Sequence, residues 1–232
     1  MHKSLVRTLA GLAFTAAAFT AQAGAIVSPQ LTLTGWAYGN GNDVAATGYS
    51  GAAGGFVGSL YGTNLVSSRS FITYCIELEE EFSFSPDPML GYAVVDGASY
   101  FERRRGDAGI ADRIGRLMSF VAADNTRVNN AASSTSLQLA IWNLVYENDY
   151  SLNLDSVFGD ASSYAAEADS LLAGAESLSS SRFDVYALER SNSQDFLLVS
   201  LHPADNAVPE PTSLALVGAA LGGLALSRRR RS

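Results

Sequence analysis

The sequence predicts an α+β fold, in which a β-sandwich or β-barrel core carries an inserted helical subdomain. Short segments rich in aromatic and β-branched residues lie near both the beginning and the end of the central part of the chain, which is typical of strands. Between them lie longer segments whose apolar residues recur every three to four positions, which is typical of helices. The strands therefore flank a helical insertion.

The first half of the central region contains most of the predicted strands. Residues 30–38 alternate in polarity, and further strands are predicted over residues 55–60, 71–78 and 92–95. Residues 39–55 are rich in Gly, Ala, Asn and Ser and are predicted to form a loop.

Three helices and two closing strands follow. Apolar residues of one stripe predict a helix over residues 108–122. A second helix is predicted from about Ser136 to Asn148, with Ser or Thr at residues 133–136 as its cap, and a third over residues 162–175. The closing strands are predicted over residues 183–188 and 195–201.

The N-terminal end of the 232-residue chain has the pattern of a secretion signal. Lys3 and Arg7 precede an apolar run over residues 9–21, and Ala21-Gln22-Ala23 is a small-x-small cleavage site. The alternative is a stable membrane anchor, for which the apolar run is short. We therefore expect a signal helix that is removed after residue 23.

The C-terminal end has a second targeting pattern. Pro209, Glu210 and Pro211 interrupt the preceding structure, and residues 212–227 are apolar and uncharged. As a helix this segment reaches about 24 Å, slightly less than the roughly 30 Å of a hydrocarbon core. It predicts a single transmembrane helix with the arginines on the cytoplasmic side. These arginines are Arg228, Arg229, Arg230 and Arg231.

In this order, the Val-Pro-Glu-Pro motif, the apolar helix and the arginine cluster resemble the PEP-CTERM sorting tail of Gram-negative bacteria that make extracellular polysaccharide. The resemblance covers residues 208–232. It implies an exported protein of the cell surface or extracellular matrix, anchored in the membrane at least transiently. Its partner would be an exosortase, a membrane transpeptidase-like enzyme; a plain tail anchor is the alternative.

Removing both ends leaves residues 24–207, which are enough for one domain. This domain holds nine basic and 22 acidic residues, a net charge of about −13, which excludes nucleic acid as a partner. Cys75 is the only cysteine, so the chain cannot form an internal disulfide. His202 is the only histidine after export, which argues against a Ser-His-Asp triad and against histidine metal sites.

Two further groups of charges are assigned to solvent. The acidic residues are taken as a solvated strand end rather than a cation site; they are Glu77, Glu79, Glu80, Glu81 and Asp87. Arg103 to Arg105 are taken as a solvated loop rather than a contact for anionic polysaccharide. We therefore expect no metal and no cofactor.

Cys75 and Gln138 are the residues to which we assign chemistry. In an alternating strand, Ile72, Tyr74 and their even-numbered neighbours would face the core, and Cys75 would face the other way. Gln138 would lie in the first turn of its helix, where unpaired N–H groups and the helix dipole favour negative charge.

Tyr74-Cys75-Ile76-Glu77 and Leu137-Gln138-Leu139-Ala140-Ile141-Trp142 resemble the two signature motifs of bacterial surface thioester domains, which are adhesin modules. Ser136-Leu137 stands where a Thr commonly precedes the Gln, and Glu77 where Asp is common. The resemblance implies an internal thioester between Cys75 and Gln138, in a barrel-like core with a helical subdomain. It implies covalent adhesion rather than enzymatic turnover.

Thioester chemistry requires these two residue types. A thiol held against a carboxamide can displace ammonia, because proximity replaces a bimolecular encounter. A helix N-terminus beside Gln138 would lower the thiol pKa and stabilise the oxyanion. Tyr74 and Trp142 are the supporting residues, with Trp142 as a shield against water or simply a packed aromatic.

The stored electrophile would capture an amine or a hydroxyl of a neighbouring surface, a polysaccharide or a polyamine. After export the chain contains no lysine, so no side-chain amine of its own would compete. The alternative is a non-reactive structural PEP-CTERM matrix protein, in which Cys75 is an ordinary buried thiol.

Overall fold

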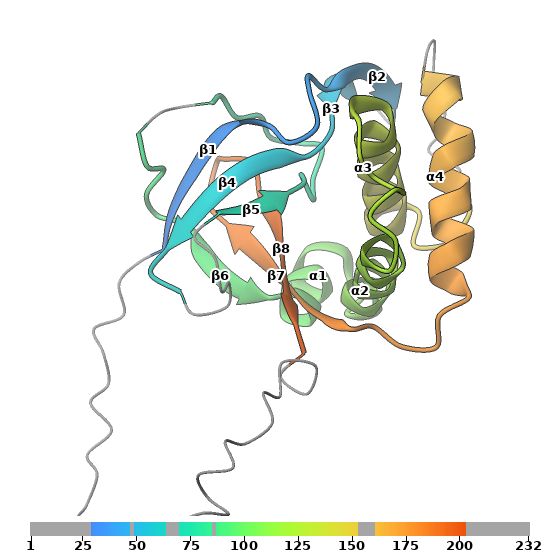
Figure 1. Cartoon of the computed structure of the whole chain (residues 1–232). Helices are drawn as coiled ribbons and strands as arrows, with labels where there is room; N and C mark the ends of the chain where they lie inside the picture. Colours follow the sequence, from blue (N-terminus) through green and yellow to red (C-terminus); the bar gives the residue numbers. More distant parts are fainter. Residues whose placement is uncertain (1–28, 47–48, 64–69, 85–86, 153–160, 203–232) are drawn as a thin grey trace, which may run out of the picture.

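The computed structural model describes residues 29–46, 49–63, 70–84, 87–152 and 161–202, and it shows a mixed α and β structure (Figure 1). The predicted signal peptide and sorting tail lie outside these ranges. Of the helices in the described ranges, none is both long and apolar enough to span a membrane.

Three antiparallel sheets make up the β structure. The first has the order β1-β4-β5, the second is the hairpin β2-β3, and the third has the order β6-β7-β8. The strands are β1 (Gln30–Trp36), β2 (Asn42–Ala46), β3 (Tyr49–Ala53), β4 (Phe56–Tyr61), β5 (Ser70–Thr73), β6 (Ala93–Asp96), β7 (Phe183–Glu189) and β8 (Phe196–Leu201).

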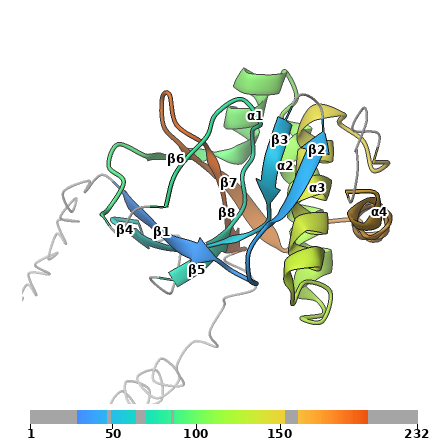
Figure 2. The same cartoon turned by 90° about the horizontal axis from the view of Figure 1, so that it is seen from above.

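In the described residues between β6 and β7, four helices follow one another. They are α1 (Gly97–Arg105), α2 (Gly109–Ala122), α3 (Ala131–Tyr146) and α4 (Ala161–Glu176). Both views place α3 between the strands and α4, and α3 packs against α2, α4 and the β2-β3 hairpin (Figures 1 and 2). The helices thus form an insertion within the third sheet, as the order of elements in the sequence predicts.

Helix α3 lies in the interior of the described structure. Its residues from Ser133 to Val145 are all buried, and a helix buried on every side belongs in the interior. Asn130 caps it: the Asn130 side chain accepts a hydrogen bond from Ser133 N, and the Ser133 side chain accepts one from Asn130 N. The predicted cap at residues 133–136 is therefore wrong, because a stronger capping box lies upstream and α3 begins at Ala131.

The segment after β5 connects the first and third sheets. Cys75 forms an isolated antiparallel bridge with Phe196 of β8. Leu197 N donates to Tyr74 O at 2.9 Å, and Ile76 N donates to Asp195 O at 3.2 Å. The chain therefore leaves the ladder of β4 at Thr73 and pairs with β8.

This crossing overturns the predicted strand over residues 71–78. Ile72, which the alternation places in the core, is 42% exposed, whereas Thr73 on the opposite face is fully buried. From Tyr74 to Glu77 every residue is buried, because this segment lies between two sheets rather than on one face of a single sheet.

Two other predictions are wrong in part. Residues 39–55 contain the β2-β3 hairpin rather than only a loop, and its small residues pair along the full length of both strands. Residues 103–105 are not a loop but the last turn of α1, which ends at Gly106 with a φ of 74°.

Candidate functional site

The structure brings Cys75 and Gln138 together from segments 63 residues apart. Cys75 N donates to Gln138 Oε1 at 3.0 Å, and Gln138 Nε2 donates to Cys75 O at 2.8 Å. Cys75 is a free thiol with 7% exposure, and Gln138 is 1% exposed. The side-chain amide of Gln138 is therefore paired with the backbone of the residue that carries the sulfur.

These hydrogen bonds limit how far the reacting atoms are apart. A C=O bond of about 1.2 Å, added to the 3.0 Å contact, places Gln138 Cδ at most roughly 4 Å from Cys75 N. The sulfur is attached to the same residue through Cβ, so its distance from Cδ depends on one χ1 rotation among staggered positions. The two hydrogen bonds therefore hold the carboxamide against the backbone of Cys75, in the interior.

The structure does not place a helix N-terminus beside Gln138, although the sequence predicted one that would lower the thiol pKa. Because α3 begins at Ala131, Gln138 lies in the third turn, away from the unpaired N–H groups of the first turn. Burial raises the pKa of the Cys75 thiol well above its usual value, and the nearby carboxyl of Glu77 raises it further. The predicted lowering of the thiol pKa is wrong, and the buried group is a neutral thiol.

A cavity of about 580 Å³ opens beside Cys75. Its walls come from β1, the β2-β3 hairpin, α3 and the segment of residues 80–84. Six aromatic residues line the cavity, namely Trp36, Tyr49, Phe56, Phe82, Phe84 and Trp142. The carboxylates of Glu80 and Glu81 also line it. Gln138 does not line the cavity, so the site is reached from the sulfur side.

Trp142 lies in the wall of this cavity, one turn after Gln138. It is 2% exposed, its ring centroid lies 5.0 Å from that of Tyr49, and its Nε1 is buried without a hydrogen-bond partner. Trp142 and Cys75 therefore line the same cavity.

Tyr74 packs behind the pair rather than in the cavity. Its hydroxyl lies 3.4 Å from Ser134 Oγ of α3, and burial raises its pKa. A Cβ at Gly55 would lie 2.8 Å from the Tyr74 ring, so glycine is required there for the ring to reach α3. Tyr74 therefore fixes the distance between the Cys75 segment and the helix.

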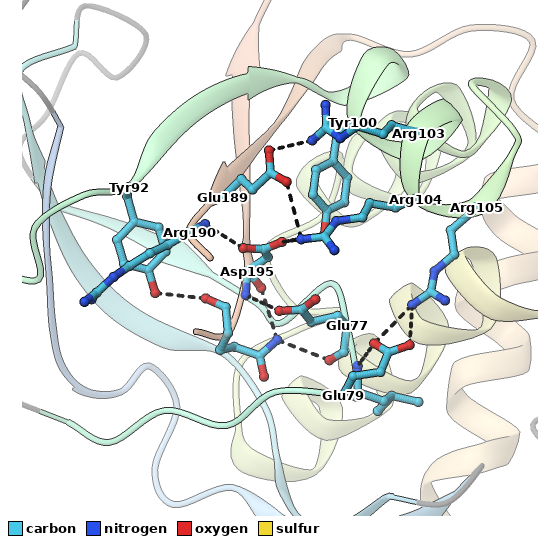
Figure 3. Close-up of polar contacts among 12 residues, drawn as sticks. Glu77, Glu79, Tyr92, Tyr100, Arg103, Arg104, Arg105, Glu189, Arg190 and Asp195 are labelled. Carbon is cyan, nitrogen blue, oxygen red and sulfur yellow. Dashed lines mark hydrogen bonds and ion pairs between the residues drawn. The ribbon is translucent and has the colours of Figure 1, made fainter. Parts of the chain in front are cut away.

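A buried acidic cluster follows Cys75 (Figure 3). The prediction that Glu77 belongs to a solvated strand end is wrong, because Glu77 is 6% exposed. Glu77 Oε1 accepts from Asp195 N at 2.7 Å. Asp195 Oδ2 accepts from the hydroxyl of Tyr100 at 2.7 Å and lies 3.4 Å from Arg104 Nη2. Asp195 Oδ1 accepts from Arg190 N at 2.8 Å.

Burial raises the pKa of both carboxyls in this cluster. Burial, followed by the charge of Asp195, raises the pKa of Glu77 to about 7, and burial raises the pKa of Asp195. Since Glu77 bonds to the start of β8, the cluster fixes the segment that carries Cys75. The position of Glu77 within the cysteine motif was the only signal in the sequence.

The arginines of α1 lie on one side of this cluster (Figure 3). Arg104 pairs with Glu189 at 3.3 Å, Arg105 pairs with Glu79 at 2.9 Å, and Arg103 also pairs with Glu189. The prediction that residues 103–105 are merely solvated is wrong. Across the described part of the chain, no group of three or more His, Cys, Asp and Glu residues is arranged to hold a metal ion.

Comparison with known protein families gives a match at the C-terminal end. Residues 207–231 match the model of the PEP-CTERM protein-sorting motif. The chain carries a PEP-CTERM sorting motif. The motif marks it as an exported, cell-surface-directed protein whose processing partner is an exosortase. Pro209, Glu210, Pro211 and the arginines 228–231 fall within the match and outside the described residues. No curated protein matches the chain at a significant level.

Proposed function

We propose that this PEP-CTERM protein stores an internal thioester between Cys75 Sγ and Gln138 Cδ. The stored bond would attach the exported chain covalently to an amine or a hydroxyl outside the cell, in adhesion or in a biofilm matrix. The observation that carries the proposal is the pair of hydrogen bonds between the Gln138 carboxamide and the Cys75 backbone.

The arrangement of the fold supports the proposal. The first and third sheets are joined at Cys75 itself, and the helix that carries Gln138 belongs to the insertion between β6 and β7. A barrel-like core with a helical subdomain is what the resemblance to thioester domains implies. The two motifs meet in space, although neither motif requires this by itself.

Thioester formation is an exchange of one bond for another. The Cys75 sulfur attacks Gln138 Cδ, the C–N bond breaks, and the thiol proton leaves with nitrogen as ammonia. Burial disfavours an ionised thiolate, but both the thiol and the thioester are neutral, so burial does not oppose the product. Proximity provides the rate advantage in place of thiolate activation.

Capture reverses the exchange with a new partner. An amine nitrogen attacks the carbonyl carbon, the C–S bond breaks, and the proton lost by nitrogen passes to sulfur. The product is an amide on Gln138 and a free Cys75 thiol. Each molecule reacts once, so we infer covalent capture rather than turnover.

The same contacts also fit a second role, in a non-reactive structural matrix protein. In that case the Gln138 amide only satisfies the N–H and C=O of Cys75, which are buried groups that need partners. The two roles differ in covalent structure, and mass measurement separates them.

The test is the intact mass of the exported chain, together with alkylation of Cys75 under denaturing conditions. We expect a mass lower than the sequence requires by one ammonia, and a cysteine that resists alkylation until an amine is added. Cys75→Ala and Gln138→Ala are the matched controls, and neither should lose ammonia. An unaltered mass with a freely alkylated Cys75 would contradict the proposal and favour the structural role.

A further inference from the structure

We infer that the cavity beside Cys75 is a recognition site for an organic ammonium ion. The inference deepens the proposed function, because it selects amines over hydroxyls as the captured class. Binding of the cation itself does not require the thioester.

The aromatic walls supply the first part of the argument. Trp36 packs against Phe56 and Phe84 with ring centroids 4.8 and 5.7 Å apart, and Phe82 lies 5.4 Å from Phe84. Tyr49 and Trp142, whose ring centroids are 5.0 Å apart, also line the cavity. Aromatic faces attract cations, and aromatic enclosures of this kind recognise alkylammonium groups.

The charges of the lining supply the second part. Glu80 and Glu81 both line the cavity, whereas no lysine or arginine among the described residues does. Glu80 Oε2 is buried without a hydrogen-bond partner, and neither carboxylate forms an ion pair with a described arginine. Glu80 is partly buried and Glu81 is exposed, so the cost of a missing partner applies to the buried oxygen of Glu80, which a cation would compensate.

The side-chain amide of Gln194, which also lines the cavity, does not compensate the two carboxylates. Gln194 Nε2 is already engaged with the backbone oxygens of Glu77 and Asp195, each at 3.2 Å. A neutral alcohol would gain apolar contact with the aromatic rings but no charge interaction. An alkylammonium ion would gain both in the cavity that Cys75 lines. To react, it would give one proton to a carboxylate of the lining and attack Gln138 Cδ as the free amine.

Binding can be measured without covalent chemistry in the Cys75→Ala variant of the full chain, purified in detergent. The chain has two tryptophans, Trp36 and Trp142, and both line the cavity, so tryptophan fluorescence reports on this site. The probes are n-butylammonium chloride and n-butanol, which have similar size and differ in charge, at constant ionic strength. We expect the ammonium to bind at least about tenfold more tightly, corresponding to about 1.4 kcal/mol.

Charge-removing variants identify the source of this preference. In the Cys75→Ala background, Glu80→Gln with Glu81→Gln should reduce the ratio of the two affinities to about one while butanol binding stays unchanged. Glu176→Gln, at the exposed end of α4, is the matched control and should keep the full ratio. Equal affinity for the two probes, or a preference that survives the double substitution, overturns the inference.

The binding experiment gives a result whether or not the thioester forms. If the wild-type chain loses ammonia but the cavity shows no preference, the proposed function stands and this inference fails. If the cavity prefers the ammonium while wild-type Cys75 alkylates freely, the cavity is a reversible cation site and the proposed function fails.

Discussion

At the scale of single residues, the proposed chemistry depends on where two side chains lie in the interior. Gln138 is buried in the third turn of α3, and Cys75 is a neutral thiol because burial raises its pKa. Neither residue is activated by a local charge or a helix end. What distinguishes them is that they are held together, so geometry rather than acidity makes the pair a candidate for reaction.

The raised pKa of Glu77 predicts a pH-dependent stability. The folded state binds the proton of this carboxyl up to about pH 7, whereas the unfolded chain releases it near pH 4.5. The stabilisation from this group is therefore complete below about pH 4.5 and is lost as the pH rises through about 7, on the order of 3 kcal/mol. Asp195, whose pKa is also raised, acts in the same direction.

Glu77→Gln tests this effect, because glutamine can still accept the hydrogen bond from Asp195 N but does not titrate. Urea denaturation between about pH 5 and pH 8 should show a smaller fall in the free energy of unfolding than the wild type shows. The experiment is done in the Cys75→Ala background, so that no cross-link contributes. Parallel pH profiles for the two chains would contradict the assignment.

At the scale of elements, the position of each helix depends on a few close contacts with the strands. Gly97, at the start of α1, lies directly against β7. A Cβ there would be 2.5 Å from the backbone oxygen of Val185. Because a backbone atom cannot move aside cheaply, α1 can approach the sheet only with glycine at this position.

Gly97→Ala should therefore lower the free energy of unfolding by about 2 kcal/mol through overpacking. Gly109→Ala at the start of α2 is the matched control, since a Cβ there would meet only the side chains of Asp107 and Arg113, at 3.0 and 3.2 Å. We expect the control to change stability by less than about 1 kcal/mol. Equal effects in urea denaturation would show that contact with β7 is not the cause.

At the scale of the whole molecule, the helical insertion brings a helix residue against a segment that joins two sheets. Residues 75 and 138 are 63 positions apart, and the chain between them includes β6, α1 and α2. A covalent bond between these residues would close a long loop and restrict the unfolded chain. On the chain-entropy model such a loop contributes about 4 kcal/mol.

Opening the thioester should therefore make the protein less stable. After treatment with methylamine, the wild-type chain should unfold at lower urea concentration, with a loss of up to about 4 kcal/mol. The Cys75→Ala variant should give the same urea denaturation curve before and after methylamine treatment, because it has no bond to open. Identical denaturation curves before and after treatment of the wild type would indicate that no cross-link was present.

The sequence determined the features that depend on local pattern. The pattern of apolar residues predicted α2, the weaker helix α4 and the two closing strands close to their observed bounds. The targeting tail was also evident, since an exosortase reads a linear segment, and residues 207–231 match the sorting motif. Cys75 and Gln138 were identified from short motifs and their resemblance, not from any pattern that places them in contact.

Only the tertiary structure decided what surrounds these two residues. The alternation around Cys75 failed because residues 74–77 cross from one sheet to another, and a crossing segment has no exposed face. Because the capping box at Asn130 starts α3 earlier than predicted, Gln138 lies in the third turn of the helix rather than in the first. The cavity and the acidic cluster join residues far apart in the chain, because burial and long-range pairing, rather than local propensity, bring such side chains together.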